Sequence, residues 1–174
     1  ARSDRQALER IGAGEHEPGA EAFRLLRGTE LAGNNGIEAS HDGRKFYVVA
    51  FGTRSILEYS VSDPSKPLRQ AVAPGFMPDN IHWQGDRLLA AGMIYDEPAC
   101  GGTRKVIDGR AEDMYCHRGY VVAALDTQTM AFSTIAYGEP NAVFTGVSVA
   151  ALIGRELWLG SFRANRIAYR LLPY

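Results

Sequence analysis

Residues 35–61 read NGIEASHDGRKFYVVAFGTRSILEYSV, and this stretch decides the fold. Its alternation of apolar and polar residues predicts a short strand at Ile37–Ser40, an apolar strand at Lys45–Phe51 and a third strand at Ser55–Val61. The turn signal His41-Asp42-Gly43 separates the first two strands. The stretch therefore predicts a unit of short strands joined in sequence.

The same plan returns twice further along the chain. The second copy has strands at Ile81–Trp83, Arg87–Met93 and Tyr120–Asp126, the third has strands at Val147–Leu152, Glu156–Ser161 and Arg166–Leu172, and fourth strands are expected at Pro67–Val72 and Met130–Ala136. The turns at Gly43 and Gly85 are 42 residues apart, within the roughly 40 to 50 residues of a propeller blade. A β-sandwich of short strands is the alternative, but repetition at this period favours the propeller.

We therefore expect an all-β fold, a partial β-propeller of about three four-stranded blades. Residues 29–174 would form these C-terminal blades, with an inserted loop at 94–118. Residues 1–28 would form the end of a preceding blade and a linker, with a short helix at Asp4–Ile11, a loop at Gly12–Gly19 and a strand at Glu21–Leu26. Propellers close rings of typically 4 to 8 blades, so missing N-terminal blades or a second copy should cover the open blade edge.

Composition narrows the possible partners. Hydrophobic residues make up 45% of the chain and charged residues 22%, which is typical of a globular protein. The 19 basic and 20 acidic residues nearly cancel, so no basic stripe is available for nucleic acid. The longest uncharged stretch, Pro140–Gly154, is shorter than the roughly 18 residues of a membrane span. We expect neither nucleic acid nor a membrane as a partner.

Two oxygen-bearing residues occupy equivalent places in successive copies. Asn35 and Asp79 each precede the first strand of a blade and are 44 residues apart. The first strand of a blade lines the channel, so both side chains should face the same mouth, where Asn80 adjoins them and Thr145 holds a similar place in the third copy. Amide and carboxylate oxygens suit calcium or another hard divalent cation. Both residues also occur commonly in turns, so the spacing leaves that alternative open.

Three segments resemble known propeller families. Residues 35–48 resemble the Asn-Gly-Ile…Ser-x-Asp-Gly…Tyr-Val signature of the gluconolactonase/regucalcin and paraoxonase families. Residues 76–81, FMPDNI, resemble the Asp-Asn-Ile stretch of the paraoxonases, and residues 157–162, LWLGSF, are similar to their last blade. The resemblance implies the C-terminal portion of a six-bladed parent. It also implies metal-ligand roles for Asn35, Asp79 and Asn80, while the acidic ligand of the first blade has no counterpart.

In these families the implied activity is calcium-dependent hydrolysis of a lactone or ester. His82, on the expected inner strand, is the candidate general base, and Thr145 is a candidate substrate-binding residue. The alternative is a non-catalytic propeller, a binding or scaffold module with a structural metal, because a fold does not determine a function. A condensing propeller of the strictosidine-synthase type is a third, weaker alternative.

The two cysteines, Cys100 and Cys116, bracket a polar stretch of the insertion. A disulfide between them would close this loop and indicate an oxidising compartment, so we expect a periplasmic or secreted protein. Two reduced thiols in a cytosolic loop are the alternative. A zinc site formed with His117 lacks a fourth ligand and the usual Cys-x-x-Cys spacing.

Overall fold

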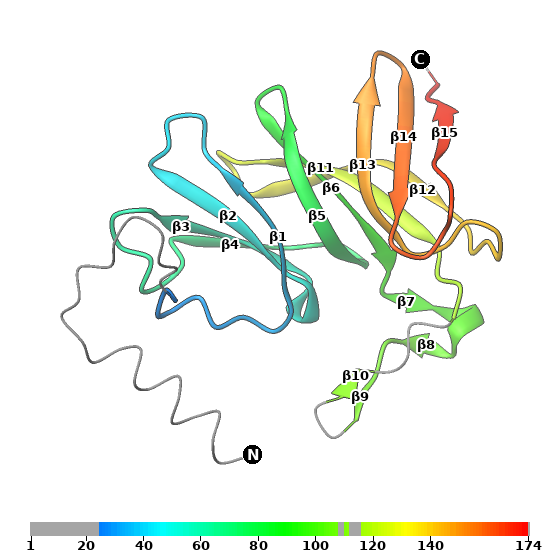
Figure 1. Ribbon diagram of the computed structural model, residues 1–174, viewed down its shortest axis with the longest axis horizontal. Coiled ribbons are helices and arrows are strands. Elements are labelled where there is room, and N and C mark those ends of the chain that lie inside the picture. The colour runs from blue at the N-terminus through cyan, green and yellow to red at the C-terminus, as the bar shows by residue number, and fades with distance from the viewer. Residues whose placement is uncertain (1–24, 108–109, 112–115, 174) are drawn as a thin grey trace.

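In the described residues, three antiparallel sheets of three or four strands stand side by side as the blades of a partial β-propeller (Figure 1). The computed structural model describes residues 25–107, 110–111 and 116–173. The helix expected at Asp4–Ile11 and the loop at Gly12–Gly19 lie outside this part. So does most of the strand expected at Glu21–Leu26, whose last two residues are described and belong to no strand. The all-β fold is confirmed.

The strands follow the predicted plan within a few residues. The first sheet has the order β1 (Asn34–Ala39), β2 (Lys45–Ala50), β3 (Ser55–Ser60) and β4 (Arg69–Val72). The second has β5 (Phe76–Gln84), β6 (Arg87–Ile94), β11 (Tyr120–Asp126) and β12 (Ala131–Gly138). The third has β13 (Val147–Ile153), β14 (Glu156–Ser161) and β15 (Ala168–Leu171), so in the described residues it has three strands rather than four.

Short elements make up the rest of the structure. Within the described ranges, two single-turn 3₁₀ helices lie at Phe51–Thr53 and Pro98–Cys100. The insertion of the second blade adds two small ladders, one of β7 (Asp96–Glu97) with β8 (Gly102–Thr103), the other of β9 (Val106–Ile107) with β10 (Arg110–Ala111). No helix in the described residues is long and apolar enough to cross a membrane.

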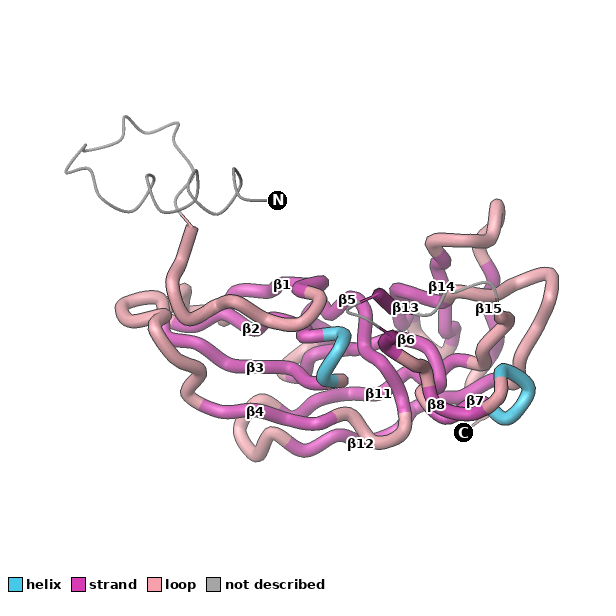
Figure 2. The backbone as a smooth tube through the Cα atoms, turned by 90° about the horizontal axis from the view of Figure 1, so that it is seen from below, coloured by secondary structure: helices cyan, strands magenta, loops and turns pink. Residues whose placement is uncertain are grey.

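The first strands of the blades lie next to one another. β5 contacts both β1 and β13, and the view from below shows the three sheets following one another in chain order (Figure 2). Glycine closes the turn after each first strand, at Gly43, Gly85 and Gly154, with φ of 67°, 64° and 59°, a conformation that side chains disfavour. The turn signals of the sequence therefore mark one and the same end of each blade.

Apolar side chains fill the spaces between blades. Between the first and second sheets a cluster includes Val49, Ile56, Phe76 and Leu88, all fully buried. Between the second and third sheets a second cluster includes Leu89, Val122 and Leu157. Each Å² of apolar surface that is buried stabilises the fold by roughly 25 cal/mol. Burial in these two interfaces therefore holds the three blades in a fixed relative arrangement.

A buried ion network reinforces the first interface. Glu58 on β3 is fully buried and binds Lys45 Nζ at 2.7 Å and the guanidinium of Arg69. Arg69 also donates to the carbonyls of Thr127 and Gln128, in the turn of the second blade. Burial alone would raise the pKa of Glu58, but the hydrogen bonds from Arg69 and Lys45 outweigh it and hold that pKa below its ordinary value. The network joins two blades through one carboxylate.

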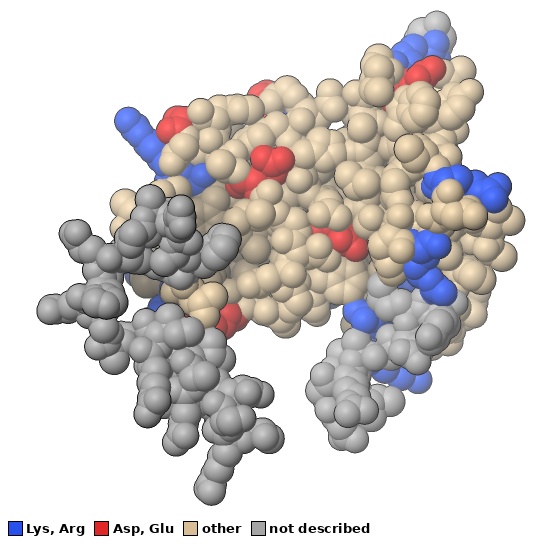
Figure 3. All heavy atoms as spheres, viewed as in Figure 1, with Lys and Arg blue, Asp and Glu red and all other residues tan. Residues whose placement is uncertain are grey.

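The third sheet has one face that no other part of the described chain covers. Cross-strand pairing places Ala151, Trp158 and Tyr169 side by side on this face, where Trp158 stacks on Tyr169 at 4.8 Å. Ile153 and Leu171, on the same face, are more than 60% exposed. In the view of Figure 3, basic side chains gather on the side of this sheet. The face has the apolar composition of a blade–blade interface but is open.

Candidate metal centre

The site begins with a backbone irregularity that recurs in all three blades. In each first hairpin the pairing shifts by one residue, between Asn34 and Ile37, between Pro78 and Asn80, and between Val147 and Val149. Such a β-bulge places an extra residue on one strand and redirects its side chain. The redirected positions are Asn35, Asp79 and Ser148, at the same level of the three inner strands.

A chain of hydrogen bonds connects these positions. The carboxylate of Asp79 accepts a hydrogen bond from the Asn35 side chain and another, of 3.0 Å, from Asn80 Nδ2. The same Nδ2 donates to the Ser148 carbonyl at 3.2 Å. The network thus joins all three blades through one carboxylate and two amides.

Gly36 allows the first two blades to approach closely at this point. A Cβ there would lie 2.7 Å from the Asn80 Cα, 2.8 Å from the Ile81 nitrogen and 3.0 Å from the Asp79 carbonyl oxygen. Real Cβ atoms almost never come this close to backbone atoms. The backbone of β1 therefore rests directly on the backbone of β5, which brings Asn35 within reach of Asp79.

Asp79 carries the ionisable group of the hydrogen-bond network formed with Asn35, Asn80 and the Ser148 carbonyl. The residue is only 8% exposed, and burial raises the pKa of its carboxyl group although the hydrogen bond from Asn35 opposes the shift. The ion pairs found in the described residues belong to Glu58, not to Asp79. A buried carboxylate held only by neutral amides is a group that a cation would stabilise.

The donors fit a hard cation in part. Asp79 offers carboxylate oxygens, and Asn35 and Asn80 would add amide oxygens, whereas calcium takes roughly 6 to 8 oxygen ligands. Both amides now present nitrogen to Asp79, so each would turn its oxygen inward to ligate. No cluster of three or more His, Cys, Asp or Glu side chains exists in the described part of the chain. The residues here can supply only one side of a calcium cage.

Two other predicted residues lie near the network without joining it. Thr145 is buried before β13, where its carbonyl accepts a hydrogen bond from Ser161 Oγ. It precedes by three residues Ser148, which is the position equivalent to Asp79. His82 is half-buried and lies two residues beyond Asn80 on β5, roughly 7 Å deeper along the strand. Their substrate-binding and base roles remain predictions.

The insertion of the second blade stands at the same end as the network. It leaves β6 at Ile94, which pairs with the start of β5 at Phe76, and it contains the predicted disulfide between Cys100 and Cys116, with a Cα–Cα distance of 5.7 Å. The disulfide is confirmed. Figure 1 shows β7 to β10 extending from this end of the blades.

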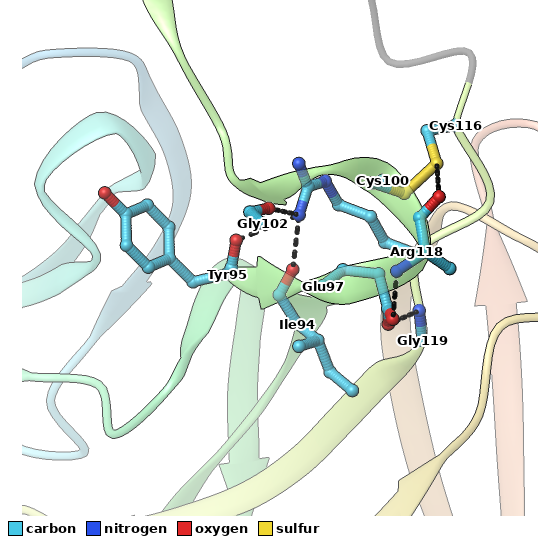
Figure 4. Close-up of a disulfide and its surroundings, with 9 residues drawn as sticks. Ile94, Tyr95, Glu97, Cys100, Gly102, Cys116, Arg118 and Gly119 are labelled. Atoms are coloured by element: carbon cyan, nitrogen blue, oxygen red, sulfur yellow. Dashed lines mark hydrogen bonds between the residues drawn. A yellow bond between two sulfur atoms is a disulfide. The ribbon is translucent and has the colours of Figure 1, made fainter.

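Two buried charged residues hold the base of the insertion. The carboxylate of Glu97 accepts a hydrogen bond from the Gly119 amide at 3.1 Å. The Arg118 guanidinium points at backbone carbonyls, those of Tyr95 at 2.9 Å and Gly102 at 3.1 Å (Figure 4). Because these contacts involve backbone groups, they fix the path of the chain at the base of the insertion. This path does not depend on which side chains the outer part of the insertion carries.

The insertion also touches the first blade. The Arg54 guanidinium lies 4.1 Å from the centre of the Tyr95 ring, and that of Arg104 lies 5.1 Å from the centre of the Phe51 ring. Cation–π contacts of this kind contribute roughly 0.5–1 kcal/mol each at exposed sites. They link the insertion to the β2–β3 connection of the first blade, at the end of the blades where Asn35 lies.

Sequence reasoning missed two features of this centre. The first is Ser148, because a bulge appears only when the pairing of two strands is known. The second is the role of Gly36, which the sequence indicates only as part of a turn pair. The available signal was an oxygen-bearing residue just before each expected first strand, and in the third copy it indicated Thr145.

Comparisons with known proteins add little to this geometry. No family model matches the chain, and no curated protein matches it. A solved structure from Bacteroides fragilis, described as a 6-phosphogluconolactonase, shares 14% identity over 86% of this chain and 36% of its own, with a TM-score of 0.48. The periplasmic gluconolactonase of Pseudomonas aeruginosa shares 15% identity over 79% and 35%, with a TM-score of 0.48.

A luciferin-regenerating enzyme shares 20% identity over 75% of this chain and 38% of its own, with a TM-score of 0.41. The chain thus spans less than two-fifths of the length of these three proteins. With TM-scores below 0.5, none of these likenesses bears on function. The three sheets themselves form part of a β-propeller.

Proposed function

We propose that Asn35, Asp79 and Asn80 form one side of a calcium site, and that the complete propeller uses this site to hydrolyse a lactone or ester. The observation that carries the proposal is the buried Asp79 carboxylate, which two amides hold and no described cation neutralises. The resemblance of residues 35–48 and 76–81 to calcium-dependent propellers supports the same interpretation. Further ligands would come from additional blades.

The residues of this chain would position the reaction. A bound calcium ion would polarise the substrate carbonyl and stabilise the oxyanion that develops. Asp79 would hold the ion together with Asn35, because the close approach of β1 and β5 at Gly36 brings these two side chains together. His82, deeper on β5, would take a proton from the attacking water, and Thr145 would contact the substrate.

The test is hydrolysis of a lactone and of an aryl ester by the full-length propeller, with calcium and after its removal. We expect turnover only with calcium, and a loss of at least 100-fold in Asp79→Ala. A matched control is Asp126→Ala, which alters a carboxylate in the β11–β12 turn of the same blade. Equal turnover with and without calcium, and in Asp79→Ala, would refute the proposal.

A specific observation favours a second candidate, the non-catalytic propeller. The network joins the inner strands of all three blades, so a cation there would act as a structural crosslink even without a substrate. In that case calcium would stabilise the propeller against unfolding while neither substrate is turned over. The hydrolysis assay separates the two candidates.

Two further proposals concern the setting of the protein. The disulfide supports a periplasmic or secreted location, because structural disulfides persist in oxidising compartments. The open apolar face of the third sheet supports a covering partner, either the missing blades or a second copy of the chain. Segment 147–174 contains four arginines and one glutamate, so the covering face should be acidic at its rim.

A further inference from the structure

We propose that the hydroxyl of Ser148 is an additional oxygen ligand of the cation site, supplied by the third blade. This inference rests on the proposed function, because it needs the site to bind a cation. It is carried by the recurrence of the same β-bulge in three inner strands. The first two bulges present Asn35 and Asp79, and the third presents Ser148.

The direction of the Ser148 side chain follows from the packing of its neighbours. Val147 and Ala150 both pack in the cluster between the second and third sheets, whereas Val149 lies between them and is 37% exposed. Counting back from Ala150 by alternation, Ser148 faces the second blade together with Val147. Two successive residues on one side of a strand are the mark of a bulge.

The surroundings of Ser148 place it in the network. The residue is only 8% exposed, and its carbonyl is bound to the Asn80 amide that also holds Asp79. No hydrogen bond of its hydroxyl is found among the described residues, and the hydroxyl oxygen is not one of their fully buried atoms without a partner, so the oxygen is free to contact a ligand. A hydroxyl is a neutral oxygen donor of the type that calcium accepts alongside carboxylates and amides.

The experiment measures calcium binding to the full-length propeller by titration calorimetry and by the calcium-dependent rise in melting temperature. Loss of one oxygen ligand in Ser148→Ala should weaken binding about 10-fold, in the range found when groups supporting a metal are removed. Ser148→Thr keeps the hydroxyl and should bind within about 3-fold of the wild type. Ser133→Ala, which removes a hydroxyl on the outer strand of the second blade, should bind like the wild type.

A fourth variant separates ligation from a structural role. Ser148→Asp replaces a neutral ligand by a charged one, so it should lower the metal-free melting temperature yet bind calcium more tightly than the wild type. A residue that merely packs would lose affinity in this variant. Unchanged affinity in Ser148→Ala, or weaker binding in Ser148→Asp, overturns the inference and leaves the proposed function standing. No calcium response in the wild type overturns both.

Discussion

The substitution Gly36→Ala should separate the first two blades where they touch. The added Cβ would meet three backbone atoms of β5 at 2.7 to 3.0 Å, whereas ordinary contacts of a Cβ begin near 3.4 Å. Backbone atoms cannot turn aside as a side chain can. The two inner strands would therefore have to move apart by about half an ångström or more.

The cost of this movement follows from the packing around it. Forcing an extra carbon into a well-packed interior costs about 1–3 kcal/mol, and the atoms met by this Cβ are all rigid, so we expect the upper half of that range. The same movement lengthens the hydrogen bond from Asn35 to Asp79. Calcium affinity should fall about 10-fold or more, which corresponds to about 1.4 kcal/mol.

Urea denaturation of the metal-free full-length propeller gives the change in the free energy of unfolding, and calorimetric titration of the same protein with calcium gives the affinity. Gly160→Ala is the matched control, because its Cβ would lie 2.5 Å from a single side-chain atom, Val149 Cγ1. That side chain is partly exposed and can rotate away, so the control should lose less than about 1 kcal/mol. Equal losses in both variants, or an unchanged calcium affinity in Gly36→Ala, would refute the reasoning.

Three other predictions concern charges and crosslinks. Because burial raises the pKa of Asp79, its ionised form destabilises the metal-free fold, and wild-type stability should increase as pH falls through this raised pKa. Asp79→Asn should therefore raise the metal-free melting temperature at neutral pH and abolish the calcium response. A lowered melting temperature would contradict this prediction. Arg69→Met leaves the buried Glu58 with one cation and should cost about 3 kcal/mol in urea denaturation, so a loss below about 1 kcal/mol would show that the network is dispensable. Replacing Cys100 and Cys116 by serine opens a loop with a sequence separation of 16 residues and should lower the free energy of unfolding by about 3 kcal/mol in urea denaturation. Calcium affinity should stay within about twofold of the wild type. A larger fall in affinity would mean that the insertion shapes the site.

The strands were predictable because they lie between strong local signals. Expected and observed bounds agree for Tyr120–Asp126 and Glu156–Ser161, where glycine or aspartate ends a run of apolar residues. The disulfide was predictable from two cysteines at the ends of one loop. The fourth strand of the third blade was not settled by sequence, because an outer strand depends on what lies beside it.

From the sequence, site residues could be predicted only where they occupy equivalent positions in successive repeats. Asn35 and Asp79 follow from a spacing close to one blade. Ser148 does not follow, because the extra residue of a bulge is defined by the partner strand and moves the equivalent position three residues beyond Thr145. The contact of Gly36 with β5 is likewise a long-range fact that no local pattern encodes.

The long insertion between β6 and β11 does not interrupt the sheet of the second blade. β6 and β11 pair without a bulge from Tyr120 with Met93 to Asp126 with Arg87, so the insertion leaves and returns at neighbouring points of one ladder. A two-residue hairpin or an entire folded domain could connect these points equally well. This junction is therefore a practical site for displaying foreign sequences at this end of the blades.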